Sequence, residues 1–162
     1  MEVVTTRIFE AWHYKIGASG KPDKSDERQS ARLLGEYTSD AKAEVAISRH
    51  RDEDGFRDWP YGFRIEETPL DVGMAASSTE RLTRTYDVRH FDIGRDDAGD
   101  TDDPTQSPTK LGAFSSKANA TVAIERARPD PRFRNFPDGF VIFSARPDID
   151  HWEGGFISWD DA

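Results

Sequence analysis

The residues best suited to chemistry are two histidines, His13 and His90, each preceded by an acidic residue three positions earlier, Glu10 and Asp87. Imidazole and carboxylate groups can share acid–base work or hold a metal ion when their side chains converge. On a flat strand, however, positions three apart point to opposite faces, so Glu10 and Asp87 would point away from the histidines. The sequence therefore favours a packing role for both histidines and predicts no catalytic residue and no metal ligand.

Two further groups have side chains that suit a binding or catalytic site. His151 precedes Trp152 and Glu153, which could supply a base and the group that orients it. Arg57 and Arg134 stand at equivalent positions of two similar stretches, and a guanidinium can clamp a phosphate or a carboxylate. A terminal aromatic strand explains the first group more simply, and pairing with Asp58 or with helix C-terminal carbonyls explains the arginines. Neither group predicts an active site.

Other enzyme chemistries find no support in the residue pattern. The chain has no cysteine, which excludes disulfides and thiolate chemistry. It has no Gly-rich phosphate loop, no Ser-His-Asp spacing and no His-x-x-x-His pair. We therefore expect a protein that is not an enzyme and holds no cofactor. The alternative that stays open is an enzyme, or a metal- or small-molecule-binding protein, with a site between the two halves that uses His13, His90 and the two arginines.

An internal repeat organises the whole chain. The stretch GFRDWPYGFRI at Gly55–Ile65 returns as RFRNFPDGFVI at Arg132–Ile142, and the shift of 77 residues also places His13 on His90. From Arg7 to Asp71 roughly 25 of the 65 positions are identical at this shift, far above chance matching. The sequence therefore predicts two copies of one module. We call residues 7–71 the first repeat and residues 84–148 the second repeat.

The repeat predicts the domain organisation. We expect a first unit at residues 1–73, a linker at 74–80, and a second unit at 81–162 that ends in an extra aromatic segment without a counterpart in the first. Each unit alone is small enough to bury only a modest core. We therefore expect an α+β protein of two tandem β-β-α-β units, each an antiparallel sheet with one helix, packed together as a pseudo-dimer.

Local patterns place the elements of each unit. Aromatic and β-branched residues predict strands, and Ser39 and Ser116 can cap the helices that follow them. Which face of the first strand is buried stays open, because neither face is cleanly apolar. The expected strands are residues 7–16, 33–38 and a strand starting at 63, with counterparts at 84–93 and 110–115, and the expected helices are 40–51 and 117–128.

The charge of the chain restricts its partners. A net charge of −9 argues against nucleic acid or an anionic membrane, because both require a positive surface. Such a charge suits solubility, or docking onto a basic protein. No signal peptide and no membrane-spanning run is visible, so a cytoplasmic protein is expected. The oligomeric state stays open.

Acidic residues in three loops are the predicted contacts with a protein partner. A calcium site in the third loop is less favoured, because the loop lacks the order of ligands of an EF-hand. The predicted contact residues are Asp23, Asp26, Glu27, Asp52, Glu53, Asp54, Asp96, Asp97, Asp100, Asp102 and Asp103.

Several motifs together resemble a known family. They are His13, Leu34–Tyr37, Gly55–Ile65, Leu70–Asp71 and His151–Phe156. This pattern is similar to that of small bacterial domains of uncharacterised function, each about one repeat long. The chain departs from it in two ways: the first repeat lacks the His-Trp segment, and the second repeat has an arginine where the motif has its first glycine.

The resemblance implies a function but no catalytic residue. Members of that family look like companions of bacterial toxin or defence loci, including immunity proteins. Together with the acidic charge, this predicts a non-enzymatic protein-binding module, an immunity protein or antitoxin that blocks the surface of a basic bacterial toxin. Electrostatic complementarity would speed such an association.

Overall fold

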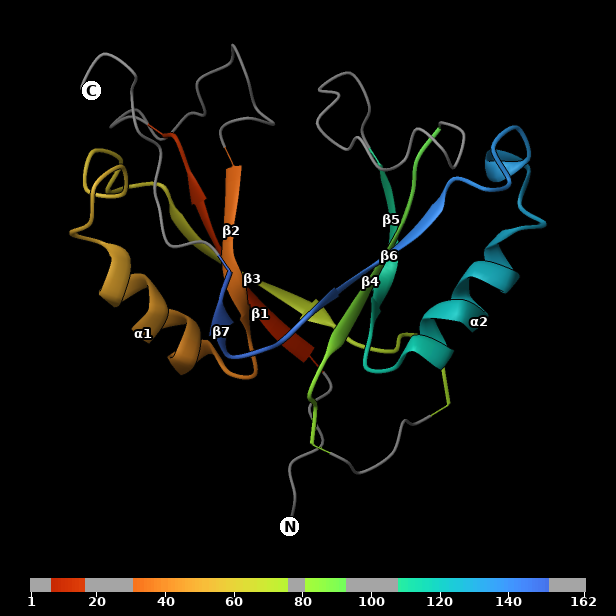
Figure 1. The fold of residues 1–162 in the computed structure, drawn as a ribbon, viewed down its shortest axis with the longest axis horizontal. Coiled ribbons are helices and arrows are strands. Elements are labelled where there is room, and N and C mark those ends of the chain that lie inside the picture. Colours follow the sequence, from red (N-terminus) through yellow and green to blue (C-terminus); the bar gives the residue numbers. More distant parts are fainter. Residues whose placement is uncertain (1–6, 17–30, 76–80, 93–107, 152–162) are drawn as a thin grey trace. The chain divides into compact units, whose positions relative to one another are not determined.

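The structure, a computed structural model of the 162-residue chain, describes residues 7–16, 31–75, 81–92 and 108–151. Within these residues the fold is α+β, with two antiparallel sheets that each pack against one helix (Figure 1). The β-β-α-β order predicted for each repeat is confirmed.

The first sheet contains three strands from the first repeat, β1 (Arg7–Tyr14), β2 (Ala31–Tyr37) and β3 (Phe63–Pro69). A short strand from the end of the chain, β7 (Ile149–Asp150), completes the order β3-β1-β2-β7. Helix α1 (Asp40–His50) packs on β1 and β2. The sequence did not predict β7, because two residues carry too little periodicity to identify a strand.

The second sheet contains β4 (Thr85–His90), β5 (Thr109–Phe114) and β6 (Phe140–Ala145) in the order β5-β4-β6. Helix α2 (Lys117–Ala127) packs on β4 and β5. A single 3-10 turn, η1 (Pro131–Phe133), follows the helix.

The two repeats share their backbone pairing in detail. β1 pairs with β2, and β4 with β5, in the same register once one pair is shifted by 77 residues. Each pair also has one register shift, at which the extra residue is Leu34 of β2 in the first pair and Leu111 of β5 in the second. Because a one-residue slip would turn every side chain to the other face, the shared register means that equivalent residues face equivalent surroundings within each repeat.

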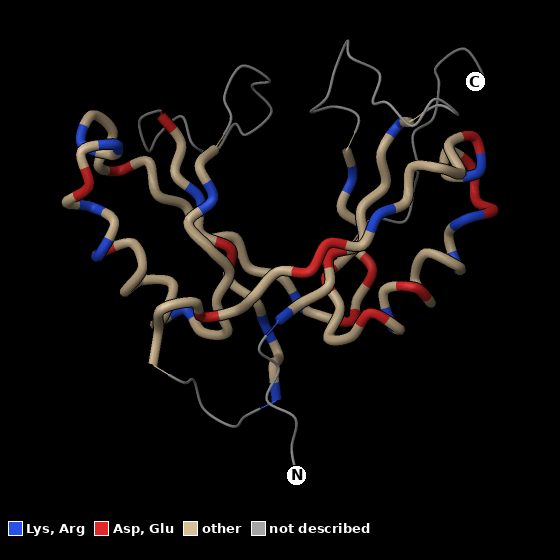
Figure 2. Tube along the Cα trace, turned by 180° about the vertical axis from the view of Figure 1, so that it is seen from behind, with Lys and Arg blue, Asp and Glu red and all other residues tan. Residues whose placement is uncertain are grey.

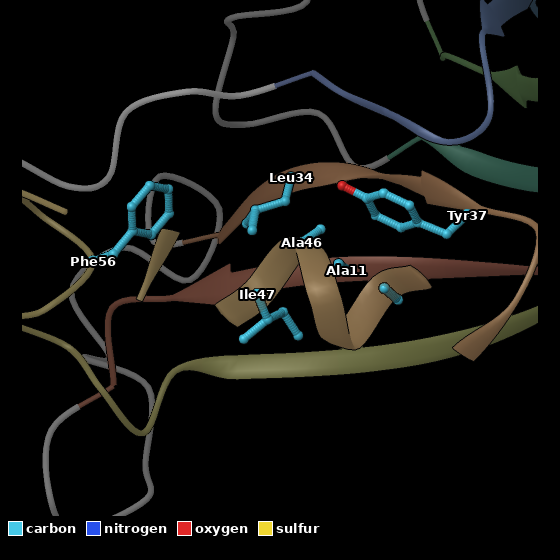
Figure 3. Close-up of a cluster of buried hydrophobic side chains, with 7 residues drawn as sticks. Ala11, Leu34, Tyr37, Ala46, Ile47 and Phe56 are labelled. Carbon is cyan, nitrogen blue, oxygen red and sulfur yellow. The ribbon is translucent and has the colours of Figure 1, made fainter. Parts of the chain in front are cut away.

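Small residues allow each helix to sit close to its sheet. Ala43 and Ala46 of α1 are fully buried against Ala11 and Leu34 of the strands. Figure 3 shows Phe56 at one end of this cluster and Tyr37 at the other. The Ala11 side of β1 therefore faces the helix, which answers the question that the sequence left open. The second core is formed by buried Val88, Phe114 and Ala120, with partly buried Leu111, Ala123, Ile124 and Ile142 around them.

Both helices begin at the predicted caps. The Ser39 hydroxyl accepts a hydrogen bond from the Lys42 amide at 3.3 Å, and the Ser116 hydroxyl accepts one from the Asn119 amide at 3.1 Å. Each bond satisfies an amide that has no partner inside the helix. The cap predictions are confirmed.

The compact units are not identical with the repeats along the chain. One unit, which we call the β1 unit, contains residues 7–68 together with the segment that starts at Pro147. The other, which we call the β4 unit, contains residues 69–146. The residues that follow β3 therefore belong with the second repeat, and those that follow β6 belong with the first. Each repeat contributes its last segment to the unit built mainly from the other.

Neither helix in the described part of the chain combines the length and the apolar character needed to cross a membrane.

Candidate functional site

The two histidines lie inside their own units. His13 and His90 are 0% and 1% exposed, and the Nε2 atom of each donates a hydrogen bond to a backbone carbonyl, that of Trp59 at 3.0 Å and that of Phe136 at 2.8 Å. The His13 ring packs on Phe56 at a centroid distance of 4.9 Å. Burial lowers the pKa of His13 despite the hydrogen bond to Trp59, so its ring is neutral at pH 7. These contacts support the packing role.

The glycines of the repeated motif explain why the histidines fit. A Cβ atom on Gly62 would collide with the carbonyl oxygen of Tyr14, and one on Gly139 with that of Phe91. Backbone hydrogen bonds join the same pairs of residues: the Tyr14 amide donates to the Gly62 carbonyl at 2.9 Å, and the Phe91 amide donates to the Gly139 carbonyl at 2.9 Å. The glycine of the motif therefore lets the backbone pack closely beside the histidine in each unit.

The other chemical candidates have partners of their own. The Thr68 hydroxyl donates to Glu10 at 3.0 Å, and Arg89 donates to Asp87 at 2.7 Å. These contacts join Glu10 and Asp87 to residues other than His13 and His90. Arg57 pairs with Asp54 at 2.8 Å, a different carboxylate from the predicted Asp58. Among the described residues there is no group of three or more His, Asp or Glu side chains that could hold a metal ion.

The predicted acidic contacts fall mostly outside the described residues. Asp52, Glu53 and Asp54 are described and lie exposed in the turns after α1, where Asp54 pairs with Arg57 and Glu53 pairs with His50. The residues that lie outside the described part are Asp23, Asp26, Glu27, Asp96, Asp97, Asp100, Asp102 and Asp103. The tail from Trp152 onward also lies outside it.

The end of each repeat that lies in the other unit is called an exchanged segment here: it starts at Pro69 in the β4 unit and at Pro147 in the β1 unit. An aspartate at equivalent positions anchors each exchanged segment. Asp148 accepts hydrogen bonds from the Thr38 amide at 2.8 Å and from the Lys42 ammonium at 2.5 Å. Asp71, its equivalent, accepts them from the Ser115 amide at 3.1 Å and from Asn119 Nδ2 at 2.9 Å. In both units the carboxylate lies beside the first turn of a helix, where the helix dipole favours a negative charge.

Backbone pairing accompanies each aspartate. The Asp148 amide donates to the Glu36 carbonyl at 2.8 Å, and the Asp71 amide donates to the Ala113 carbonyl at 3.0 Å. The His151 amide extends the first pairing with a bond to the Leu34 carbonyl at 2.5 Å. The exchanged segments thus lie along the outer edges of β2 and β5, edges that would otherwise expose unpaired amides and carbonyls.

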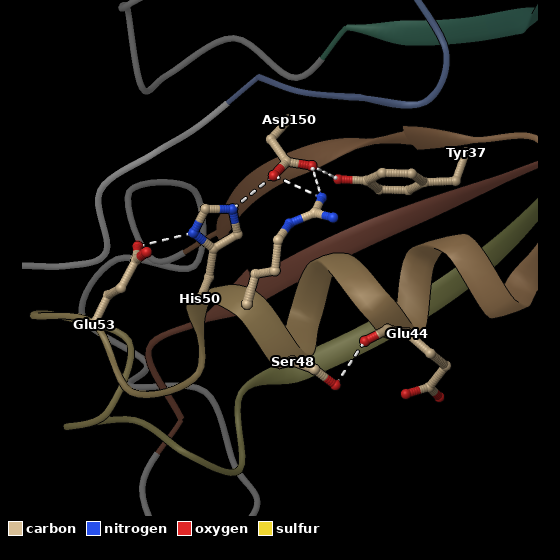
Figure 4. A network of polar contacts seen from close by, with 7 residues as sticks. Tyr37, Glu44, Ser48, His50, Glu53 and Asp150 are labelled. Atoms are coloured by element: carbon tan, nitrogen blue, oxygen red, sulfur yellow. Dashed lines mark hydrogen bonds and ion pairs between the residues drawn. The ribbon is translucent and has the colours of Figure 1, made fainter.

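A polar cluster distinguishes the β1 unit (Figure 4). Asp150 accepts hydrogen bonds from the Tyr37 hydroxyl at 2.6 Å, from Arg49 at 2.9 Å and from His50 Nε2 at 2.9 Å. His50 Nδ1 donates to Glu53 at 2.8 Å. We call these five residues the Asp150 cluster. It joins α1, β2 and the turn after α1 to the exchanged segment.

The cluster shifts the pKa of its members. Burial alone would lower the pKa of His50, but its bonds to Glu53 and Asp150 outweigh burial and raise it. Burial would raise the pKa of Asp150, yet the bonds from Tyr37, His50 and Arg49 lower it overall. Burial and the bond to Asp150 raise the pKa of Tyr37. The two carboxylates beside the His50 ring therefore stabilise its charged form.

This arrangement holds Asp150 in place. Both nitrogens of His50 face carboxylate oxygens, and a protonated imidazole donates to both of them. Asp150 already accepts from three donors. The cluster instead ties Asp150 to the first sheet with charge-assisted hydrogen bonds, which are stronger than neutral ones.

The β4 unit lacks this cluster. Phe114 stands at the position of Tyr37, Ala127 at that of His50 and Gly73 at that of Asp150. Asp130 stands at the position of Glu53, and the arginine is kept: Arg126 donates to the Gly73 carbonyl at 3.0 Å. The sequence analysis missed the cluster, although one signal was visible: His50 lies on the buried stripe of its helix, where the second repeat has alanine.

Comparisons of the chain with protein-family models, with curated proteins and with solved structures found no match. The resemblance described from the motifs therefore stays a prediction.

Proposed function

We propose that this chain is a non-enzymatic protein-binding module. The observation that supports it most directly is the use of the repeated signature for packing. His13, Phe56 and Gly62 close one unit, and His90 and Phe133 hold the same places in the other. The side chains with the best catalytic potential are thus enclosed, and the exposed surface is left for a partner.

The partner that we propose is a basic bacterial toxin, which the chain would neutralise as an immunity protein or antitoxin. The net charge of −9 supports attraction to a basic surface. Along the described trace, acidic and basic residues are interleaved (Figure 2). The turn segment after α1 combines exposed Asp52 and Asp54 with Tyr61, whose side chain is 63% exposed. Exposed tyrosines are common anchors at protein interfaces.

The test is co-expression with the product of the gene next to its own. If that product is toxic, the wild-type chain is expected to restore growth and to co-purify with it. The double variant Asp52→Lys with Asp54→Lys is expected to slow association and to weaken rescue, and the effect should shrink at high salt.

The matched control reverses two exposed acids elsewhere, Glu125→Lys with Asp138→Lys, which changes the net charge by the same amount. Equal loss in both variants would indicate general charge attraction rather than a specific surface. A neighbouring product that is not toxic, together with the absence of any co-purifying basic protein, would contradict the proposal.

A further inference from the structure

The edge of β2 binds the exchanged segment that starts at Pro147. The site consists of the β2 backbone, which pairs with Ile149 and Asp150, and of the Thr38 and Lys42 side chains, which bind Asp148. We call this the acceptor site. Its ligand is an extended segment with an aspartate in a left-handed turn, since Asp148 has φ 64°.

The ligand of the acceptor site comes from the other repeat. Residues 69–146 form one compact unit, and the chain passes from it into the β1 unit at Arg146 and Pro147. The contacts described for the segment join it to the β2 backbone and to the side chains of Thr38 and Lys42, and they depend on the chemistry of the segment rather than on the chain that supplies it. Within the described part of the chain, the segment held by this site runs from Pro147 to His151.

From this geometry we infer a second occupant: the acceptor site on β2 and α1 binds segment 147–151 of a second copy of the chain, which gives a segment-exchanged dimer. The exchanged dimer would contain the same hydrogen bonds as the monomer, so contacts do not disfavour it. The balance is set by effective concentration, which for a tethered segment is about millimolar. The dimer therefore forms when the segment is released at high protein concentration and then docks again.

The pairing of β2 with β7 allows the exchange to be measured with a disulfide cross-link. Ile149 stands opposite Glu36 in the antiparallel register of β2 and β7. Opposite residues of antiparallel strands have Cα atoms about 4.5–5.5 Å apart, within disulfide range. The natural chain has no cysteine, so every introduced thiol reports on one position only.

The experiment uses two single variants of the full chain, Glu36→Cys and Ile149→Cys. They are mixed at high concentration, opened with mild denaturant, returned to buffer and oxidised. A covalent heterodimer is expected at several-fold higher yield than in a control mixture of Ile149→Cys with Val45→Cys, an exposed position on α1. The double variant in one chain is expected to close an internal disulfide.

A complementation test covers the case in which Glu36→Cys fails to fold. One chain loses its segment contacts through Asp148→Ala with Asp150→Ala. The other loses its acceptor contacts through Thr38→Val with Lys42→Ala. Each variant is expected to be monomeric alone. The mixture is expected to form a heterodimer, because an intact segment meets an intact acceptor only there. Heterodimer yields at the control level in both tests would overturn the proposal.

Discussion

Asp71 and Asp148 lie 77 residues apart and do the same work in different units. Both adopt left-handed backbone angles, with φ of 56° and 64°. The amide of each aspartate donates a hydrogen bond to a strand carbonyl. The carboxylate of each aspartate accepts a hydrogen bond from the amide of the residue before a helix cap. Left-handed angles are uncommon outside glycine, and aspartate is among the residues that tolerate them. This equivalence supports one shared docking mode for both exchanged segments.

Removal of either carboxylate is expected to loosen its own unit. Asp148→Ala loses charged hydrogen bonds to Thr38 and Lys42, which are worth roughly 1.5–3 kcal/mol in general. Hydrogen exchange should rise at β2 and α1 and stay unchanged at β5. In Asp71→Ala, hydrogen exchange should rise at β5 and stay unchanged at β2 and α1. Matching patterns in both variants would contradict the assignment of one segment to each unit.

The motif glycines are expected to tolerate no side chain. Gly62→Ala places a Cβ against the Tyr14 carbonyl and beside His13, and such overpacking costs roughly 1–3 kcal/mol. Urea denaturation should show this loss as a lower midpoint. Tyr61→Ala, one residue earlier and 63% exposed, is the control and should change stability little.

His13 is expected to act through packing and its neutral charge state. His13→Ala removes a buried ring and leaves the Trp59 carbonyl without this donor, at a cost of roughly 2–5 kcal/mol. Because burial lowers the pKa of His13, its contribution is full above pH 6.5 and is lost as the pH falls through the lowered value. Stabilisation of the wild type by added zinc, absent in His13→Ala, would favour the metal-binding alternative.

The Asp150 cluster is expected to hold the segment best at mildly acidic pH. The raised pKa of His50 means that its contribution is full below pH 6.5 and is lost as the pH rises through the raised value. The lowered pKa of Asp150 means that its contribution is full above pH 3.8 and is lost as the pH falls through the lowered value. Docking should therefore be tightest between about pH 4 and 6.5. The NMR chemical shifts of Ile149 as a function of pH measure this docking. The variant His50→Gln should remove the loss of docking at the upper end of the pH range.

An exchange of equivalent residues tests the difference between the two units. Tyr37→Phe copies the second repeat and removes the hydroxyl that binds Asp150, at a cost of roughly 0.5–1.5 kcal/mol. Phe114→Tyr adds a hydroxyl at a position only 3% exposed and should cost roughly 1–3 kcal/mol if it stays unpaired. Calorimetry of both variants measures these losses. A stabilised Phe114→Tyr would show that the second unit can accept the polar pattern.

The sequence by itself determined the repeat, the α+β class, the element order within each repeat and the helix caps. These features depend on local patterns: strand composition, the alanine stripe of each helix, and a serine before each first turn. It also favoured a packing role for the histidines, since strand alternation separates His13 from Glu10. Comparison of the two repeats adds that Asp71 and Asp148 are identical, although nothing local tells what they bind.

Only the tertiary structure decided where the end of each repeat docks. The pairing of Ile149 with Glu36 spans more than a hundred residues of chain, and two paired residues carry no periodicity of their own. The Asp150 cluster likewise depends on contacts of Asp150 with Tyr37, Arg49 and His50, which are distant in sequence. Backbone hydrogen bonds at a sheet edge are available to any extended segment, so the choice of partner comes from side chains that meet only after folding.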